Sequence, residues 1–250
     1  MDGFGNPSYL SPLWTDLEIH RTMRRMWNLS APPGFQGLRE DVALTTYFRH
    51  LPHWRQDGAT YFVTFRLGDS LPQEKLRELA ALRTDWERQC PFTRDKVAWE
   101  RLSREVMRRV EAWLDQGMGS CALRDPTNAA IVRESLHHFD AQRYELASYV
   151  IMPNHVHALV RPLACSLYPL EKILQSWKQF TAKRVLGQSG ISVSMWQEES
   201  FDRIVRDEEH LYRCVQYIGN NPARAKLAKG ASLRWIRPEW EALGWKFAPT

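Results

Sequence analysis

The chain has 250 residues, 44% of them hydrophobic and 25% charged, with a formal net charge of +5. This composition is that of a globular protein with a sizeable core and excludes a disordered or fibrous chain, while the excess of positive charge favours a polyanionic partner. Because no apolar run approaches the roughly 18 residues of a membrane span and the four cysteines form no CxxC pair, we expect a cytoplasmic protein without membrane span, zinc ribbon or disulfide framework.

Residues 1–50 show little regular periodicity, so we expect an N-terminal extension that packs on the main domain or trails from it. The first clear element is a strand over Thr60–Leu67, which is rich in aromatic and β-branched residues and lies between glycine-containing turns. From Gln73 to Met118 the apolar residues take helical spacing, which predicts a helical insertion over about residues 72–125. We assign no chemistry to the extension or to the insertion.

The segment after the insertion predicts a helix over residues 125–139, a strand over Tyr144–Ile151, a turn at Pro153 and Asn154, and a strand over His155–Arg161. The helix begins with cap-forming side chains and is amphipathic. The two strands are close enough along the chain to form a hairpin.

Three further elements follow: a helix from Leu170 that ends at Gly187, a short irregular strand within residues 193–206, and a helix capped by Asp207 that ends before Pro222. The order of elements is a strand, inserted helices, a helix, two strands, a helix, a strand and a helix. This order predicts an α+β fold: a ferredoxin-like, split βαβ antiparallel sheet with helices on one face.

Two histidines in the stretch MPNHVHALV stand one residue apart on a predicted strand. Side chains alternate between the faces of a strand, so His155 and His157 share one face while Val156 and Ala158 occupy the other. Two neutral imidazoles on one face could bind a single metal ion if a third ligand came from elsewhere in the chain. The alternative is a pair that only forms hydrogen bonds within the sheet.

The last predicted helix carries the residues best placed to complete such a site. Tyr217 and Asn221 are four residues apart, so they share a helix face, and the amide oxygen could bind a metal beside the phenol. A tyrosine oxygen could then attack a phosphodiester that the metal polarises. Alternatively, the tyrosine is a packing anchor and the asparagine a helix stop. Tyr212 lies about 140° round the helix from Tyr217 and is the less suitable nucleophile.

Basic residues are concentrated in the segments around these motifs, with ten Lys or Arg against six acidic residues between Lys172 and Lys229. Cationic side chains contact DNA phosphates and set register on the strand, although a solvated helix face has the same composition. The residues predicted to bind DNA are Lys178, Lys183, Arg184, Arg203, Arg206 and Arg224.

The ordered set MPNHVHALV, FTAKR, WQ, FDRIVRD and YIGNNPARAKL resembles the REP-associated tyrosine transposases, a branch of the HUH single-strand DNA transposase superfamily. The resemblance covers residues 51–228 and leaves 229–250 as a C-terminal tail. It implies a ferredoxin-like catalytic domain in which His155 and His157 hold Mg²⁺ or Mn²⁺, Asn221 is the third ligand and Tyr217 attacks DNA. The chain departs from many relatives after WQ, where EESFDR places Phe201, which cannot act as a nucleophile.

The resemblance implies a transposase or endonuclease that binds single-stranded, hairpin-forming repeat DNA and cleaves one strand. Cleavage would leave a 5′-phosphotyrosine and a free 3′ hydroxyl, and the ends would be rejoined without ATP, in agreement with the absence of a P-loop motif. We expect a nucleoid-associated monomer or homodimer with no nucleotide cofactor. Two other readings remain: a domesticated protein that binds repeat DNA without cutting it, and a metal-dependent hydrolase in which water replaces the tyrosine.

Overall fold

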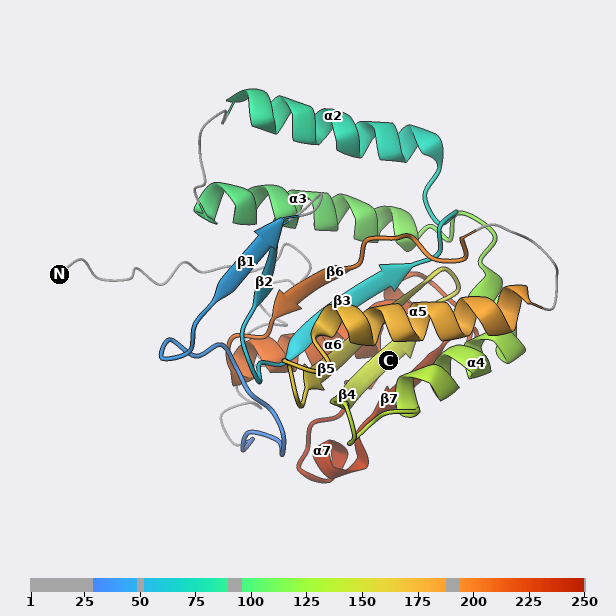
Figure 1. Cartoon of the computed structure of the whole chain (residues 1–250). Coiled ribbons are helices and arrows are strands. Elements are labelled where there is room, and N and C mark those ends of the chain that lie inside the picture. The colour runs from blue at the N-terminus through green and yellow to red at the C-terminus, as the bar shows by residue number, and fades with distance from the viewer. Residues whose placement is uncertain (1–28, 49–51, 90–95, 188–193, 250) are drawn as a thin grey trace.

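A computed structural model describes residues 29–48, 52–89, 96–187 and 194–249 of the chain (Figure 1). Its centre is a five-stranded antiparallel sheet with the strand order β6-β3-β5-β4-β7. The strands are β3 Tyr61–Arg66, β4 Tyr144–Ile151, β5 His155–Pro162, β6 Phe201–Ile204 and β7 Leu233–Ile236. The prediction of an α+β fold built on an antiparallel sheet is therefore confirmed.

The connections between these strands are those of the predicted split βαβ arrangement. The chain runs through β3, helix α4 (Pro126–His137), β4, β5, helix α5 (Leu170–Leu186) and β6. Each helix connects two strands that are consecutive in the chain: α4 joins β3 to β4, and α5 joins β5 to β6. Strand β5 lies between β3 and β4 in the sheet. The Asp125 side chain caps α4 by accepting a hydrogen bond from the backbone of Thr127 at 2.8 Å, as its sequence indicates.

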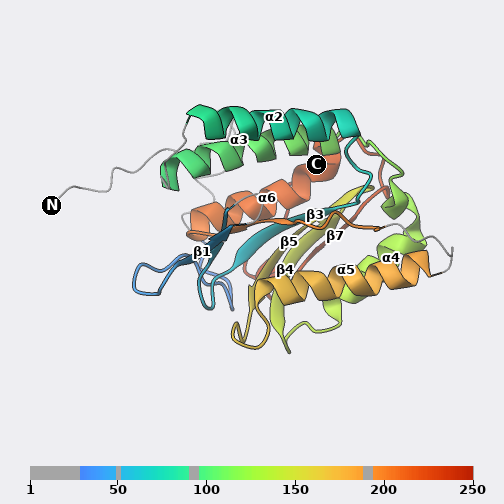
Figure 2. The same cartoon turned by 45° about the horizontal axis from the view of Figure 1, so that its top comes forward.

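Helices cover both faces of the sheet, so the prediction of helices on one face alone was wrong. Helices α4 and α5 lie on one face, and helix α6 (Glu208–Arg224) lies on the other (Figure 2). The physical reason is that β5 is buried on both sides: Val156 packs in the core beneath α4 and α5, and Leu159 packs in the core beneath α6. A strand with apolar side chains on both faces requires a covering layer on each.

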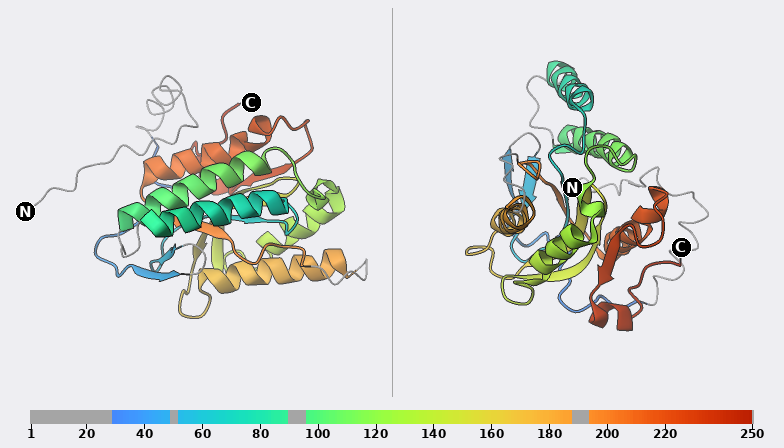
Figure 3. Two further views of the ribbon diagram at one scale, coloured as in Figure 1. Left: turned by 90° about the horizontal axis from the view of Figure 1, so that it is seen from above. Right: turned by 90° about the vertical axis from the view of Figure 1, so that its right-hand side faces the viewer.

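The predicted insertion forms a helical hairpin of α2 (Gln73–Gln89) and α3 (Lys96–Leu114), which lies on the same side of the sheet as α6 (Figure 3). No residue of α2 is buried, whereas Val110 and Leu114 of α3 form a small core with Leu71. The inner helix of the insertion is thus α3, which faces the domain. No helix in the described part of the chain is both long and apolar enough to cross a membrane.

Both ends of the described chain join the domain. Strands β1 (Thr45–Phe48) and β2 (Pro52–Arg55) pair as a separate antiparallel ribbon, and the indole of Trp240 donates a hydrogen bond to the Pro33 carbonyl at 2.9 Å. Residues 229–250, predicted as a tail, instead contribute β7, which pairs with β4, and the short helix α7 (Pro238–Ala242). The first 28 residues of the predicted extension lie outside the described residues.

Candidate functional site

His155 and His157 stand at the start of β5 and point to the face covered by α6. Their Nε2 atoms are 3.0 Å apart and their ring centroids 4.6 Å apart. The residues between and after them, Val156 and Ala158, belong to the core on the opposite face. The predicted sharing of one face is therefore confirmed. Both imidazoles are almost fully buried, at 1% and 0% exposure.

The side chain of Asn154 determines which nitrogen of His155 carries its proton. The Asn154 amide nitrogen donates to the carbonyls of Leu114 and Met118, both at 3.2 Å, so its oxygen faces the His155 Nδ1 at 2.8 Å. An amide oxygen only accepts, so Nδ1 must be the donor. The Nε2 of His155 is then unprotonated, so its lone pair accepts from His157 or binds a metal ion.

His157 has a partner that suits either tautomer. Its Nδ1 lies 2.8 Å from the hydroxyl of Thr64, the residue opposite it on β3, and a hydroxyl can donate or accept. When no metal ion is bound, the Nε2 of His157 carries the proton and donates to the Nε2 of His155. When a metal ion is bound, the Nδ1 of His157 can carry the proton and donate to Thr64, which leaves the Nε2 of His157 free to bind the ion. Burial lowers the pKa of His155 to about 3 and that of His157 well below its usual value, so both rings are neutral at pH 7.

Helix α6 places three polar side chains of the candidate site on one face above the histidines. Tyr217, Asn221 and Arg224 are spaced by four and three residues, which is one turn each. The prediction that the helix ends before Pro222 was wrong: α6 continues to Arg224, and the backbone of Ala225 still bonds to the Asn221 carbonyl at 3.0 Å. Proline removes one helical hydrogen bond, but within the last turn the helix tolerates the loss. This continuation brings Arg224 to the site.

The phenol and the amide both meet the histidine pair. The Tyr217 ring lies edge-on to His157, with centroids 5.1 Å apart, and edge-on to Phe62 at 5.7 Å. The Asn221 side chain is fully buried and lies close enough to His155 to oppose the effect of burial on the pKa of that ring. The structure therefore brings together the four residues predicted from sequence to form the site.

Several polar atoms here are buried without a partner. Among the described residues, the Tyr217 hydroxyl, both polar atoms of the Asn221 amide and the Nη1 of Arg224 have no hydrogen bond. Each such atom costs on the order of 1–3 kcal/mol when buried and unpaired. Buried polar groups are nearly always satisfied in proteins, so four unpaired atoms at one place indicate a site that a ligand completes.

The donor set fits a divalent metal ion. Two ligand nitrogens that each lie about 2.1 Å from one ion at a right angle are about 3 Å apart, and the two Nε2 atoms stand 3.0 Å apart. The Asn221 oxygen is an unpaired buried acceptor beside them. No group of three His, Cys, Asp or Glu side chains gathers anywhere in the described ranges, so the third protein ligand would be an amide oxygen.

The insertion contributes two acidic side chains that sequence reasoning missed. Asp115, in the turn just after α3, pairs with Arg224 through Oδ2 and Nη2 at 3.1 Å, and Glu111 lies one helical turn earlier, near the Tyr217 phenol. Burial raises the pKa of Tyr217 well above its usual value, the charge of Glu111 raises it further, and Arg224 lowers it. The spacing of Glu111 and Asp115 was visible in the sequence, but nothing local connects it with residues 100 positions away.

The six residues predicted to bind DNA divide between the two faces of the sheet. Arg203 and Arg224 belong to the site: Arg203 lies over the Phe62 ring at 5.0 Å, and its charge reaches His157. Arg206 lies in the connection between β6 and α6. The other three residues lie on α5, which covers the opposite face of the sheet, so they do not join the site. These residues are Lys178, Lys183 and Arg184.

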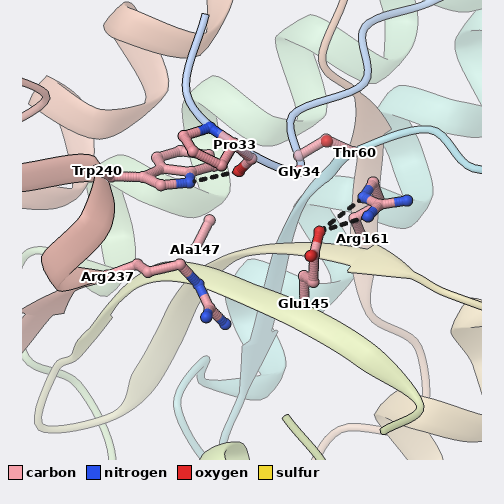
Figure 4. Close-up of a pocket in the computed structure, with 8 residues that line it drawn as sticks. All are labelled: Pro33, Gly34, Thr60, Glu145, Ala147, Arg161, Arg237 and Trp240. Carbon is pink, nitrogen blue, oxygen red and sulfur yellow. Dashed lines mark hydrogen bonds and ion pairs between the residues drawn. The ribbon is translucent and has the colours of Figure 1, made fainter. Parts of the chain in front are cut away.

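A small cavity elsewhere in the domain holds none of the predicted site residues. It has a volume of about 10 Å³ and is lined on one side by Trp240 and Arg237 and on the other by the ion pair of Glu145 with Arg161 (Figure 4). Arg161 is six residues along β5 from His155, about 20 Å at the rise of a strand. This cavity has room for at most one water molecule, so it is a packing gap and not the functional site.

No family model matches the chain, and no curated protein sequence matches it. Among solved structures, the chain is similar to that of a REP-associated tyrosine transposase bound to a REP hairpin. The TM-score is 0.42 and the identity 15%, over 75% of this chain and 78% of that chain. We draw no residue role from this similarity.

Proposed function

We propose that this protein is a REP-associated tyrosine transposase of the HUH superfamily that cleaves and rejoins one strand of hairpin-forming DNA. The observation that carries the proposal is the convergence of His155, His157, Asn221 and Tyr217 on one side of the sheet, with unpaired buried atoms among them. Two of the motifs that carry the resemblance, MPNHVHALV on β5 and YIGNNPARAKL on α6, meet at this site, which supports the proposal.

The residues divide the chemistry between them. Tyr217 is the nucleophile, because its hydroxyl is buried, unpaired and next to the histidine pair. His155, His157 and Asn221 would hold Mg²⁺ or Mn²⁺, and Asn154 and Thr64 orient the two rings. The bound ion would polarise the scissile phosphate and stabilise charge on its non-bridging oxygens. Arg203 and Arg224 provide positive charge for the phosphate backbone.

In the proposed cleavage step, the Tyr217 oxygen forms a bond to phosphorus and the bond from phosphorus to the 3′ oxygen breaks. The phenolic proton leaves the tyrosine and the 3′ oxygen gains a proton, so a 5′-phosphotyrosine and a free 3′ hydroxyl result. The reverse attack by a 3′ hydroxyl rejoins a strand. The number of phosphoester bonds does not change, so no nucleotide cofactor is needed.

The test is to incubate the protein with labelled single-stranded DNA that contains a repeat hairpin, in the presence of Mn²⁺, and to look for a covalent complex on a denaturing gel. We expect the complex with the wild-type protein and its loss in Tyr217→Phe. The matched control is Tyr212→Phe, which changes a tyrosine on the same helix that packs against Trp245 instead of the histidines. Tyr212→Phe should retain the complex.

The other outcomes separate the alternatives. Cleavage that persists in Tyr217→Phe would show that water is the nucleophile and would reject the tyrosine mechanism. A shift of the DNA on a native gel without cleavage by the wild-type protein would identify a binding protein that no longer cuts.

A further inference from the structure

We propose that Asp115 of the helical insertion is a positioning residue that holds the Arg224 guanidinium against the Tyr217 phenol. The inference rests on the proposed function for what the phenol does, and on the geometry of three side chains for the contact itself. It gives the insertion a role in the site, where the sequence assigned it none.

The Arg224 side chain lies between the other two. Its Nη2 is 3.1 Å from the Asp115 carboxylate, and its Cζ is 4.9 Å from the centre of the Tyr217 ring. The ion pair is mostly shielded from solvent, with the side chains of Arg224 and Asp115 exposed to 27% and 17%. A charge pair with this degree of burial is screened less by salt than one at the surface, and it fixes the orientation of a planar guanidinium.

The ion pair with Asp115 uses one terminal nitrogen of the Arg224 guanidinium and leaves the other, Nη1, able to donate at the site. With Nη2 occupied by Asp115, Nη1 is buried and has no partner among the described residues, and the nearby Tyr217 hydroxyl has none either. A cationic donor next to the phenol can take up the negative charge that develops on the tyrosine oxygen and the phosphate during attack. A freely rotating arginine would lose conformational entropy when it became ordered during the attack. The ion pair with Asp115 orders the Arg224 side chain beforehand.

The backbone supports the same placement of the insertion. The Asn154 side chain donates to the carbonyls of Leu114, which precedes Asp115 at the end of α3, and of Met118, three residues after Asp115. Asn154 also orients His155. The end of α3 is therefore fixed at the histidine pair and at Arg224 at once, so Asp115 is held by more than its own ion pair.

The direct test is the mobility of the Arg224 side chain by NMR, which does not depend on activity. In ¹⁵N-arginine-labelled protein, the Arg224 guanidinium, assigned by its absence in Arg224→Lys, should show restricted rotation and slow proton exchange. In Asp115→Asn the Arg224 guanidinium should rotate freely, so that its separate NMR signals merge and its protons exchange rapidly with water. The matched control, Asp85→Asn, removes an acid of the same insertion that pairs with the exposed Arg88, and should leave the Arg224 signals unchanged. Unchanged Arg224 signals in Asp115→Asn would overturn the inference.

The functional readout separates positioning from DNA binding. We expect Asp115→Asn to slow formation of the covalent complex about 10- to 100-fold while DNA affinity stays within about threefold of wild type, and Asp115→Glu to restore part of the rate. An equal rate in Asp115→Asn would contradict the role even where the ion pair exists. If the wild-type protein forms no complex at all, the proposed function fails and the NMR comparison still decides whether Asp115 holds Arg224.

Discussion

Asn154 joins the insertion to the histidine pair through one side chain, since its amide nitrogen donates to the carbonyls of Leu114 and Met118 and its oxygen accepts from His155. The sequence marked this residue as part of a turn before the strand. Its second role follows from the fold, because the amide donors need acceptors that are 36 and 40 residues away in the chain. A residue that orients a metal-binding histidine affects the ligand without touching the ion.

We predict that Asn154→Ala weakens Mn²⁺ binding about 10- to 100-fold, because His155 loses the acceptor that fixes its tautomer. Isothermal titration calorimetry measures the change. The matched control is Asn128→Ala, which removes an asparagine that likewise donates to a backbone carbonyl, that of Ala122, but lies on α4, on the other face of the sheet. Equal affinities in wild type and Asn154→Ala would show that the hydrogen bond does not tune the site.

The length of helix α6 determines which of its side chains belong to the candidate site. Its sequence predicted the start at Asp207, whose side chain accepts from the backbone of His210 at 2.7 Å. It misplaced the end, because proline is a reliable helix terminator only where the lost hydrogen bond is not replaced by other contacts. Pro222 itself donates no bond, but Ala225 donates to the Asn221 carbonyl and Leu227 to the Pro222 carbonyl, so the chain stays coiled past the proline and the extra turn carries Arg224.

On the other face, a buried polar cluster joins three elements. His53 of β2 lies 2.7 Å from Asp202 of β6 through Nδ1 and 3.3 Å from Glu199 through Nε2, so each ring nitrogen faces a carboxylate. Arg55 pairs with the same Asp202 at 2.5 Å and with Glu171 of α5 at 2.6 Å. The cluster therefore attaches the β1-β2 ribbon to the edge of the sheet through charged groups.

This cluster predicts a pH dependence of stability. Burial lowers the pKa of His53, but the hydrogen bonds with Asp202 and Glu199 outweigh it and raise the pKa from 6.5 to about 9. A pKa raised in the folded state stabilises the fold fully below the unfolded value and loses that effect as the pH rises through the folded one. The contribution of His53 should therefore be complete below pH 6.5 and disappear by about pH 9.

Urea denaturation at pH 6 and at pH 9.5 measures this effect. The wild-type free energy of unfolding should fall between these pH values by on the order of 1–3 kcal/mol more than that of His53→Asn. The change His138→Asn, which removes a histidine at the end of α4 outside the cluster, should leave the wild-type slope in place. Equal slopes in wild type and His53→Asn would show that His53 carries no charge in the fold.

At the scale of the molecule, the sheet separates a layer of α4 and α5 from a layer of α6 and the insertion, and the site lies in the second layer (Figure 2). The sequence predicted β3, β4, β5 and β6, because β-branched and aromatic runs bounded by turns are local signals, but it did not predict β1 and β2. It could not predict the strand β7 within residues 229–250, whose four-residue length gives little periodicity. The order of elements alone also did not predict which face of the sheet each helix covers.

The candidate site divides in the same way. The histidine pair and the spacing of Tyr217 and Asn221 are local patterns on single elements, so the sequence showed them. Asp115 and Glu111 reach the site only because the insertion packs along α6, and three of the six residues predicted to bind DNA lie on α5, which covers the opposite face. Contacts between elements distant in sequence were therefore where the prediction from sequence failed.

Peptide mass spectrometry identifies the residue that becomes covalently joined to DNA, which we propose to be Tyr217. The protein is reacted with a repeat-hairpin oligonucleotide and Mn²⁺, then digested with protease and nuclease, and the modified peptide is sequenced. We expect a single peptide that carries a nucleotide 5′-phosphate on Tyr217. A nucleotide found on any other residue, or cleaved DNA with no modified peptide, would contradict it.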